Sequence, residues 1–259
     1  MNHKGKFAAE VTENIKKLGE DKSLGDLTDQ WIRRTNKHGY TYNFSWLGRP
    51  IIQYPQDMVA MAELIWAIRP DLIIETGIAH GGSLIFYASM LAMLDLCDAI
   101  EAGERLDPAK SNRQVLGLDI DIRAHNRKEI EAHPMSTRIR MIQGSSIAPD
   151  VVSTVRAIAG SHKCVVVALD SNHTHAHVLA ELEAYAPLVS VGSYCVVFDT
   201  KIEDMPAEMF ADRPWGPGNS PLTAVREYLV THPEFKVDFQ IESKLQITVA
   251  PGGYLQRMS

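Results

Sequence analysis

Short apolar runs and longer stretches with helical periodicity alternate along most of the chain. Continuous apolar runs are typical of strands buried in a parallel sheet, and apolar residues every three or four positions predict amphipathic helices. Strands are predicted at 72–74, 114–121, 138–146, 163–169 and 192–198. Helices are predicted at 57–68, 84–94, 150–159, 178–186 and 222–231. This alternation predicts an α/β fold with a doubly wound, Rossmann-like, mostly parallel sheet.

The two ends of the chain depart from this alternation. Residues 1–35 are charged and amphipathic, and residues 40–56 are aromatic with two prolines. We expect residues 1–56 to be an N-terminal extension, either a plain surface layer or a lid or dimerisation arm, before a Rossmann-like domain at 57–259. The aromatic segment either lies over a ligand cleft or packs as an aromatic layer. Residues 235–241 and 245–250 predict a C-terminal antiparallel strand pair.

Composition narrows the partners and the compartment. Of 259 residues, 45% are hydrophobic and 22% charged, which suits a folded domain with a sizeable core. The net charge of −6 and the lack of a Lys/Arg face make nucleic acid an unexpected partner. Cys97, Cys164 and Cys195 fit no zinc motif or disulfide framework, as expected in a reducing cytoplasm. We expect no membrane-spanning stretch and no signal peptide, and a homo-oligomer is the default assembly.

A glycine loop joins the first predicted strand to its helix. It contains Glu75, Gly77, Gly81 and Gly82, at the sheet edge where α/β proteins bind ligands. Glycine permits positive φ and lets a ligand approach the backbone. The spacing lacks the second glycine of a dinucleotide fingerprint, and the charge of Glu75 would repel a phosphate. The loop therefore favours a cationic ligand over a dinucleotide, although a plain turn is the simpler alternative.

S-adenosylmethionine fits this pattern because it carries a sulfonium and an amino group but no phosphate. Glu75 can attract its methionine part, and Asp119 at the second strand end can accept both ribose hydroxyls. Ser145 and Ser146 follow Gly144 at the third strand end and could contact the adenine. This ordered set predicts a methyl-donor site.

Two further carboxylates, Asp170 and Asp199, end successive strands and should point into one cleft. They could be unrelated solvated acids, an acid/base pair, or oxygen ligands of a hard cation. We favour the last, because Mg²⁺ typically takes one or two carboxylates together with waters and substrate oxygens. Such a metal would lower the pKa of a bound hydroxyl and orient it toward the methyl group.

Three histidines, His173, His175 and His177, follow Asp170 at intervals of two residues. This spacing does not place side chains on one helical face, so a three-histidine metal cluster is not expected. His173 lies nearest to Asp170 and is the candidate general base, since imidazole titrates near neutral pH. A structural hydrogen-bonding role is the alternative.

These motifs resemble those of the cephalosporin hydroxylase and rhamnosyl O-methyltransferase family. The resemblance covers the chain from about residue 40 onward. It rests on Ser45-Trp-Leu-Gly-Arg-Pro-Ile-Ile-Gln-Tyr-Pro-Gln-Asp57, Arg69-Pro-Asp-Leu-Ile-Ile-Glu-Thr-Gly77, Gly81-Gly-Ser83, Asp170-Ser-Asn-His173, Asp199-Thr200, Trp215-Gly-Pro-Gly218 and Gly253-Tyr-Leu255.

The resemblance implies methyl transfer from S-adenosylmethionine to a hydroxyl, with Mg²⁺. The acceptor would be a (deoxy)sugar in a natural product, such as an antibiotic, or in a glycolipid; methoxylation of a β-lactam is the alternative. It also implies that Gly77, Gly81, Ser83 and Asp170 contact the cofactor.

Asp170 and Asp199 match the family's metal-ligand positions. The family often has Glu immediately before the second Asp, where this chain has Phe198. Glu203 or Asp204 could substitute for that carboxylate, or waters and substrate could complete the shell. The departure also leaves open a non-catalytic protein that binds the cofactor and assists a partner enzyme.

Overall fold

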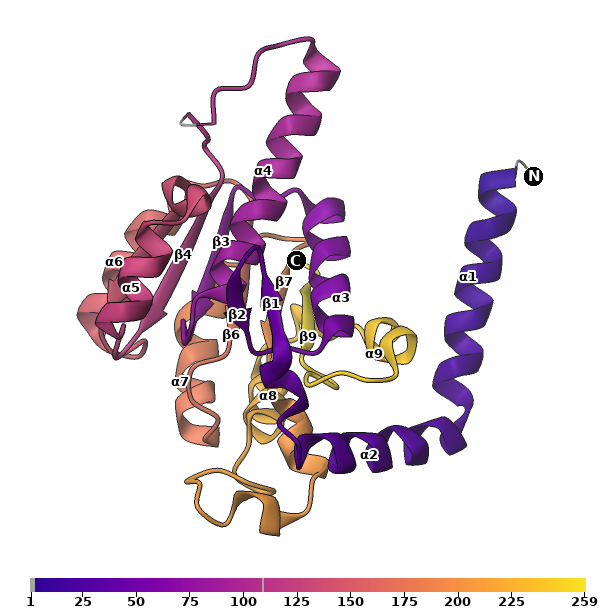
Figure 1. Ribbon diagram of the computed structural model, residues 1–259. Coiled ribbons are helices and arrows are strands. Elements are labelled where there is room, and N and C mark those ends of the chain that lie inside the picture. Colours follow the sequence, from indigo (N-terminus) through magenta and orange to yellow (C-terminus); the bar gives the residue numbers. More distant parts are fainter. Residues whose placement is uncertain (1–2, 109) are drawn as a thin grey trace.

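The apolar runs form a seven-stranded sheet in the order β5-β4-β3-β6-β7-β9-β8. The computed structural model describes residues 3–108 and 110–259 (Figure 1). The strands are β3 (Leu72–Thr76), β4 (Gln114–Asp119), β5 (Ile139–Gln143), β6 (Val165–Leu169), β7 (Tyr194–Val197), β8 (Phe235–Val237) and β9 (Tyr254–Arg257). β3 to β7 are parallel, and β9 runs antiparallel to both β7 and β8. The expected α/β sheet with a C-terminal antiparallel pair is confirmed.

The position of the ligand crevice follows from this strand order. β4 pairs with one side of β3, and β6 pairs with the other side. The strands that follow β3 in the chain are therefore added first on one side of it and then on the other. Such a switch point leaves a crevice at the carboxyl ends of the two strands. The glycine loop leaves β3 and Asp170 follows β6, so both enter this crevice.

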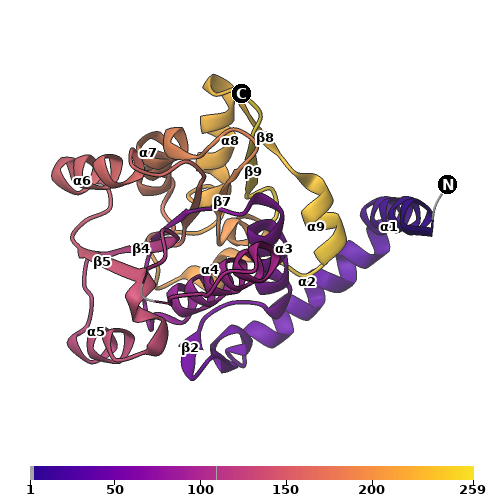
Figure 2. The ribbon, with the colours of Figure 1, turned by 90° about the horizontal axis from the view of Figure 1, so that it is seen from above.

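Two layers of helices cover the sheet (Figures 1 and 2). One core cluster joins the sheet to α6, α7 and α8, and the other joins it to α3, α4 and α5. The helices are α3 (Pro55–Ile68), α4 (Gly82–Ala102), α5 (Ala124–Glu131), α6 (Pro149–Ala159), α7 (His175–Tyr185) and α8 (Pro221–Thr231). Because both faces are covered, β3 and β6 are buried along their whole length, as their continuous apolar runs predict.

Helix α4 bears on the expected absence of a membrane-spanning stretch. By length and composition it is apolar enough to cross a membrane, but a core helix of a folded domain passes the same test, and the expectation stays a prediction. It is also longer than the predicted helix, since it continues to Ala102. Leu84, Leu91 and Leu94 are fully buried in the core cluster beside β3, and this packing accounts for much of the apolar character of the helix.

The first two helices form an arm beside the sheet domain (Figure 1). They are α1 (His3–Glu20) and α2 (Lys22–Asn36), and a β1 (Phe44–Trp46) and β2 (Arg49–Ile51) hairpin follows. Trp31 packs edge-on against Tyr40 with ring centroids 4.8 Å apart, and Tyr54 joins the same cluster. Asn36 accepts a hydrogen bond from the Tyr54 hydroxyl at 2.9 Å. These contacts tie the arm to the segment that leads into α3.

The C-terminal strand prediction is only half right. β8 lies within the predicted 235–241 run, but its antiparallel partner is β9 and not residues 245–250. Residues 239–245 form helix α9 (Phe239–Leu245), whose first turn is capped by Asp238 accepting from the Gln240 N–H at 3.1 Å. The run 245–250 bends instead toward Asp57, whose carboxylate accepts from the Val249 N–H at 3.0 Å. A side-chain cap and a buried acid thus override the apolar pattern.

Candidate active site

The glycine loop packs directly on the chain that follows β6. Gly77 has φ 89°, and a Cβ there would lie 2.0 Å from the Asp170 carbonyl oxygen. A Cβ at Gly82 would lie 2.2 Å from the Pro50 carbonyl oxygen. Gly77 is required both by its positive φ and because a Cβ would clash, whereas Gly82 is required only because a Cβ would clash. This packing brings the ends of β3 and β6 and the β1–β2 hairpin together.

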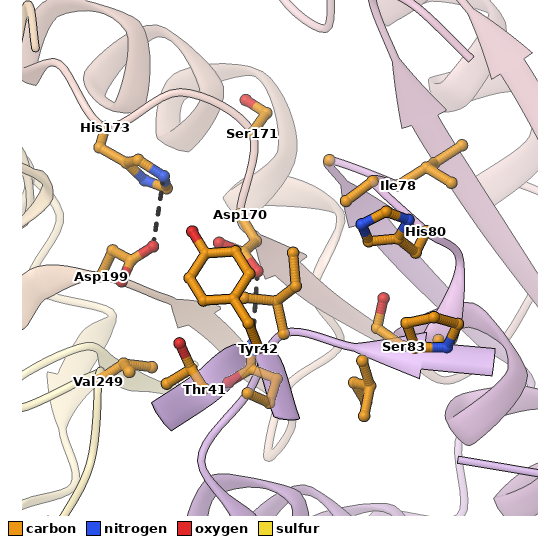
Figure 3. A pocket seen from close by; sticks show the side chains of 17 residues that line it. Thr41, Tyr42, Ile78, His80, Ser83, Asp170, Ser171, His173, Asp199 and Val249 are labelled. Carbon is orange, nitrogen blue, oxygen red and sulfur yellow. Dashed lines mark hydrogen bonds and ion pairs between the residues drawn. The ribbon is translucent and has the colours of Figure 1, made fainter. Parts of the chain in front are cut away.

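A cavity of about 300 Å³ lies between these segments (Figure 3). The loop contributes Gly77 and Ser83 to its wall, while Asp170, His173 and Asp199 come from the ends of β6 and β7. The 40–56 segment forms another wall through Thr41, Tyr42, Pro50, Ile51, Ile52 and Gln53. That segment therefore lies over the cleft and also contributes to the aromatic cluster. It combines the two expected roles, a cover over the ligand cleft and an aromatic packing layer.

Glu75 lies behind the cavity wall. It is 1% exposed, and its carboxylate accepts a hydrogen bond from the Ser83 hydroxyl at 2.7 Å. Tyr87 also donates to it. Burial raises the pKa of Glu75 to about 8, and these hydrogen bonds oppose the rise. Ser83 thus separates this buried acid from the cavity, and attraction of a cationic cofactor by Glu75 stays a prediction.

The Asp119 carboxylate holds the glycine loop through hydrogen bonds from its backbone. One of its oxygens accepts from the N–H groups of Ile78 at 2.8 Å and Ala79 at 3.3 Å. The other accepts from the Asp121 N–H at 3.0 Å. Neither Asp119 nor Gly81 is part of the cavity lining. Ribose binding by Asp119 stays a prediction, in which the ribose hydroxyls would join or replace these backbone partners.

The two serines after β5 also lie outside the cavity lining. Ser146 is buried, its hydroxyl is 3.0 Å from the Nε2 of His177, and its carbonyl accepts from the Tyr185 hydroxyl. Ser145 accepts from the Ala148 N–H at 3.0 Å through its carbonyl. Their predicted contact with adenine is not tested by these positions.

Asp170, His173 and Asp199 form the chemical centre of the cavity. One donor atom from each lies within 4.8 Å of the others, and the His173 Nε2 is 3.3 Å from the Asp199 Oδ2 (Figure 3). Burial, followed by the charge of Asp199, raises the pKa of Asp170 well above its ordinary value. Asp199 is a non-glycine residue at φ 56°, a sparsely populated conformation that is concentrated at functional sites. The two predicted carboxylates do point into one cleft.

The other two histidines of helix α7 turn away from this centre. His175 places its Nδ1 2.8 Å from the Thr223 hydroxyl and its Nε2 3.1 Å from Glu227. His177 lies 3.4 Å from Glu181. The three imidazoles thus have separate partners and do not converge on one point.

Neither proposed substitute for the missing family carboxylate reaches the centre. Glu203 accepts from the Gly218 N–H at 2.9 Å and the Ser220 hydroxyl at 2.7 Å, which anchors the 205–219 loop. Asp204 pairs with Lys201 at 3.3 Å. Phe198 is 2% exposed within the core cluster of α3 and α4. The suggestion that Glu203 or Asp204 completes the metal site is therefore wrong, because Glu203 binds the neighbouring loop and Asp204 pairs with Lys201.

A second cavity of about 480 Å³ adjoins the first and shares Tyr42, His173 and Asp199 with it. Its remaining wall combines aromatic and aliphatic side chains with polar ones such as Asn36 and Lys201, and Trp215 of the Pro/Gly-rich loop stands edge-on to His173 at a centroid distance of 4.9 Å. The cavity is also lined by Ile32, Tyr54, Met205, Met209, Phe210 and Arg213. In the sequence, residues 215–218 of this loop stand out only as part of the family resemblance, and the contribution of helix α2 is not indicated.

Gln53 belongs to the site, although its place in the Ser45–Asp57 motif did not indicate a role for it. It is 8% exposed, and its amide nitrogen donates to Asp170 at 3.4 Å. Its amide oxygen is buried and has no hydrogen-bond partner among the described residues. No lysine or arginine of residues 5–108 and 110–259 pairs with Asp170 either. Unsatisfied acceptors around two carboxylates fit a cation or a ligand with donor groups.

Comparisons with known proteins identify the family. The model of the rhamnosyl O-methyltransferase/CmcI family matches residues 38–258. A rhamnosyl O-methyltransferase of Mycobacterium leprae (strain TN) is 27% identical over 216 residues, which cover 82% of each chain. One from Mycobacterium tuberculosis (strain ATCC 25618 / H37Rv) is 29% identical over 208 residues, covering 78% of this chain and 73% of that protein.

Solved structures agree on the fold. A CmcI structure with Mg and SAM has a TM-score of 0.55 at 18% identity and covers 84% of this chain and 78% of its own. Another CmcI structure, with SAH, has a TM-score of 0.54 at 20% identity and covers 83% of each chain. The chain therefore belongs to the rhamnosyl O-methyltransferase/CmcI family, a family of S-adenosylmethionine-dependent O-methyltransferases.

Proposed function

We propose that the protein transfers the methyl group of S-adenosylmethionine to a hydroxyl of a (deoxy)sugar, in a natural product or glycoconjugate, with Mg²⁺. The observation that carries this proposal is the group of Asp170, His173 and Asp199: all three line the first cavity, and His173 and Asp199 also line the second. Donor and acceptor can therefore meet at one polar centre between two separate spaces.

The donor fits the first cavity. Its wall is the glycine loop at the switch point of the sheet, the position where α/β folds hold such cofactors. The Ser83 hydroxyl and the Gln53 amide face a ligand there, and buried Glu75 stands one side chain behind. No phosphate-binding feature is needed for this ligand, in agreement with the acidic surroundings.

Asp170 and Asp199 would hold the metal ion, which supplies a positive charge that lowers the pKa of an acceptor hydroxyl. Two carboxylates and an adjoining imidazole fit a divalent cation, and a bound cation would oppose the burial and the charge of Asp199 that raise the pKa of Asp170. His173 lies in the same group and is placed either to accept the hydroxyl proton or to bind the metal. The surrounding side chains would hold the two substrates in line and limit access of water.

The acceptor fits the second cavity. The rings of Trp215, Phe210 and Tyr42 offer flat surfaces for the C–H face of a sugar, and the relatives named above are rhamnosyl O-methyltransferases. We assign residues 1–56 the role of a lid, because helix α2 and residues 40–56 provide part of this wall. Free thiols at Cys97, Cys164 and Cys195 suit a reducing cytoplasm.

A non-catalytic, cofactor-binding role is the second candidate, and buried Phe198 is the observation that favours it. A non-sugar hydroxyl, as in β-lactam methoxylation, is the other possible acceptor. A panel of glycosides and non-sugar alcohols, assayed with a labelled methyl donor, separates these functions. Transfer to sugars alone supports the proposal, and no transfer to any acceptor by metal-loaded protein with bound donor supports the non-catalytic role.

The isosteric variant Asp170→Asn tests the metal centre. It should lose about 100-fold or more of turnover, because metal-ion activation of the hydroxyl contributes several kcal/mol, while donor binding falls much less. Calorimetry with S-adenosylmethionine and single-turnover assays measure the two effects. Asp150→Asn, an exposed acid on α6, is the control. Unchanged turnover of Asp170→Asn, or full activity of the wild type after chelation, would remove the metal from the proposal.

A further inference from the structure

The residue before Asp199 supplies no ligand to the metal centre. The Phe198 side chain is 2% exposed and lies in an apolar pocket with Met58, Met61 and Phe86. Phe198 has no side-chain oxygen that could bind a cation held by Asp170 and Asp199. Glu203 and Asp204 are bound elsewhere, so the protein offers two carboxylates and must take any third side-chain ligand from another residue.

An imidazole stands where a third ligand is needed. The His173 Nε2 is 3.3 Å from the Asp199 Oδ2, and one donor atom each of Asp170, His173 and Asp199 falls within 4.8 Å of the others. Adjacent ligands of an octahedral ion with bonds of about 2.1 Å are separated by about 3 Å. The observed separation is therefore close to the spacing of two ligands on one ion.

The orientation of His173 is fixed by its surroundings. The imidazole lies perpendicular to Trp215, with an angle of 89° between the rings. Figure 3 shows the ring directed at Asp199 across the cavity wall. The side chain is only 18% exposed, so it has few alternative positions. Within the described parts of the chain this is the group of acids and histidines close enough to share an ion.

We propose that His173 binds the metal directly through Nε2, so that this site prefers Mn²⁺ to Mg²⁺. A nitrogen ligand favours first-row transition metals over Mg²⁺, whereas carboxylates and water suit both ions. The inference rests on the metal site of the proposed function and adds the identity of its third ligand. Mg²⁺ binds the same two carboxylates, but the imidazole contributes less to its affinity.

Electron paramagnetic resonance of the purified protein with Mn²⁺ alone tests this inference without an activity assay. The sharp signal of free Mn²⁺ should be lost in proportion to one site, and Mg²⁺ should displace the ion only at about tenfold or greater excess over Mn²⁺. The bound ion should show hyperfine coupling to one directly bonded imidazole nitrogen.

His173→Ala should abolish this coupling and weaken Mn²⁺ binding by at least about tenfold, with a smaller effect on Mg²⁺. His175→Ala is the matched control, because its imidazole lies at the start of α7 and contacts Thr223 and Glu227 of α8, away from the proposed metal site. Circular dichroism shows whether each variant folds.

The outcomes separate the two proposals. Bound Mn²⁺ without nitrogen coupling in the wild type overturns the role of His173 and leaves the carboxylate metal site standing. Mn²⁺ that stays free overturns both this inference and the metal part of the proposed function. Coupling that persists in His173→Ala assigns the nitrogen to another residue and also refutes the inference.

Discussion

Replacing Glu75 by Gln tests how the protein attracts a cationic methyl donor. The carboxyl group is 1% exposed and has a pKa of about 8, because burial disfavours its charged form. At pH 7 it is therefore protonated in roughly ten of eleven molecules. A sulfonium or ammonium bound beyond Ser83 would favour the ionised form, so donor binding should release close to one proton at pH 7.

The magnitude follows from this pKa. Ionising Glu75 at pH 7 costs about 1.4 kcal/mol of binding free energy, and this cost disappears near pH 9. Wild-type affinity for S-adenosylmethionine should rise about tenfold over that range relative to Glu75→Gln. Any titration of the ligand itself affects both proteins equally, so the difference between them reports Glu75.

The same pKa predicts a change in stability of known sign. The pKa of Glu75 in the folded protein lies above its ordinary value of 4.5. Its contribution to the free energy of unfolding is therefore fully present below pH 4.5 and is lost as pH rises through about 8. The difference between 4.5 and about 8 corresponds to about 5 kcal/mol. Denaturant unfolding of the protein without donor should show Glu75→Gln gaining stability over the wild type toward pH 9.

Calorimetry in two buffers of different ionisation enthalpy measures the released protons directly. Glu101→Gln, an exposed acid on the same helix as Ser83, is the control and should behave like the wild type. The reasoning is refuted if wild type and Glu75→Gln show parallel pH dependence of affinity and the wild type releases no proton on binding.

Two further substitutions test the walls of the site. Gly77→Ala should lose at least about 2 kcal/mol of stability, because its Cβ would lie 2.0 Å from the Asp170 carbonyl oxygen and its φ is positive. Gly103→Ala also has positive φ but no neighbour within 4 Å, so similar losses in thermal unfolding would contradict the contact argument. Trp215→Ala should raise the KM of a sugar acceptor about tenfold and leave donor affinity within about twofold, because a lost aromatic contact costs on the order of 1 kcal/mol. Steady-state kinetics and calorimetry measure these effects, and an equal loss for both substrates would argue against an acceptor site beside Trp215.

The sequence was sufficient to predict the parallel sheet and the strand ends that carry the site. Buried strands and amphipathic helices leave strong periodic patterns, and the glycine loop and Asp170 both follow such strands. The second carboxylate, Asp199, was predictable for the same reason. These positions depend on local chain order, which a single sequence records directly.

Other features depend on contacts between distant segments. Gln53 meets Asp170 across 117 positions of the chain, and helix α2 reaches the second cavity through tertiary packing. The burial of Glu75 behind Ser83 and the binding of Glu203 by Ser220 also require the folded chain. Near the C-terminus, the apolar pattern of residues 245–250 is typical of a strand, but the hydrogen bond from the Val249 N–H to the Asp57 carboxylate holds that segment outside the sheet.

The most direct test of the central claim is transfer of the methyl group itself. Metal-loaded wild type, incubated with methyl-labelled S-adenosylmethionine and a rhamnose-bearing glycoside, should place the label on one sugar oxygen, as mass spectrometry and magnetic resonance of the product would show. Chelated wild type and Asp170→Asn should leave the glycoside unlabelled while still binding the donor. Labelling at an equal rate in all three samples, or label found on no sugar of a broad glycoside panel, would contradict the account.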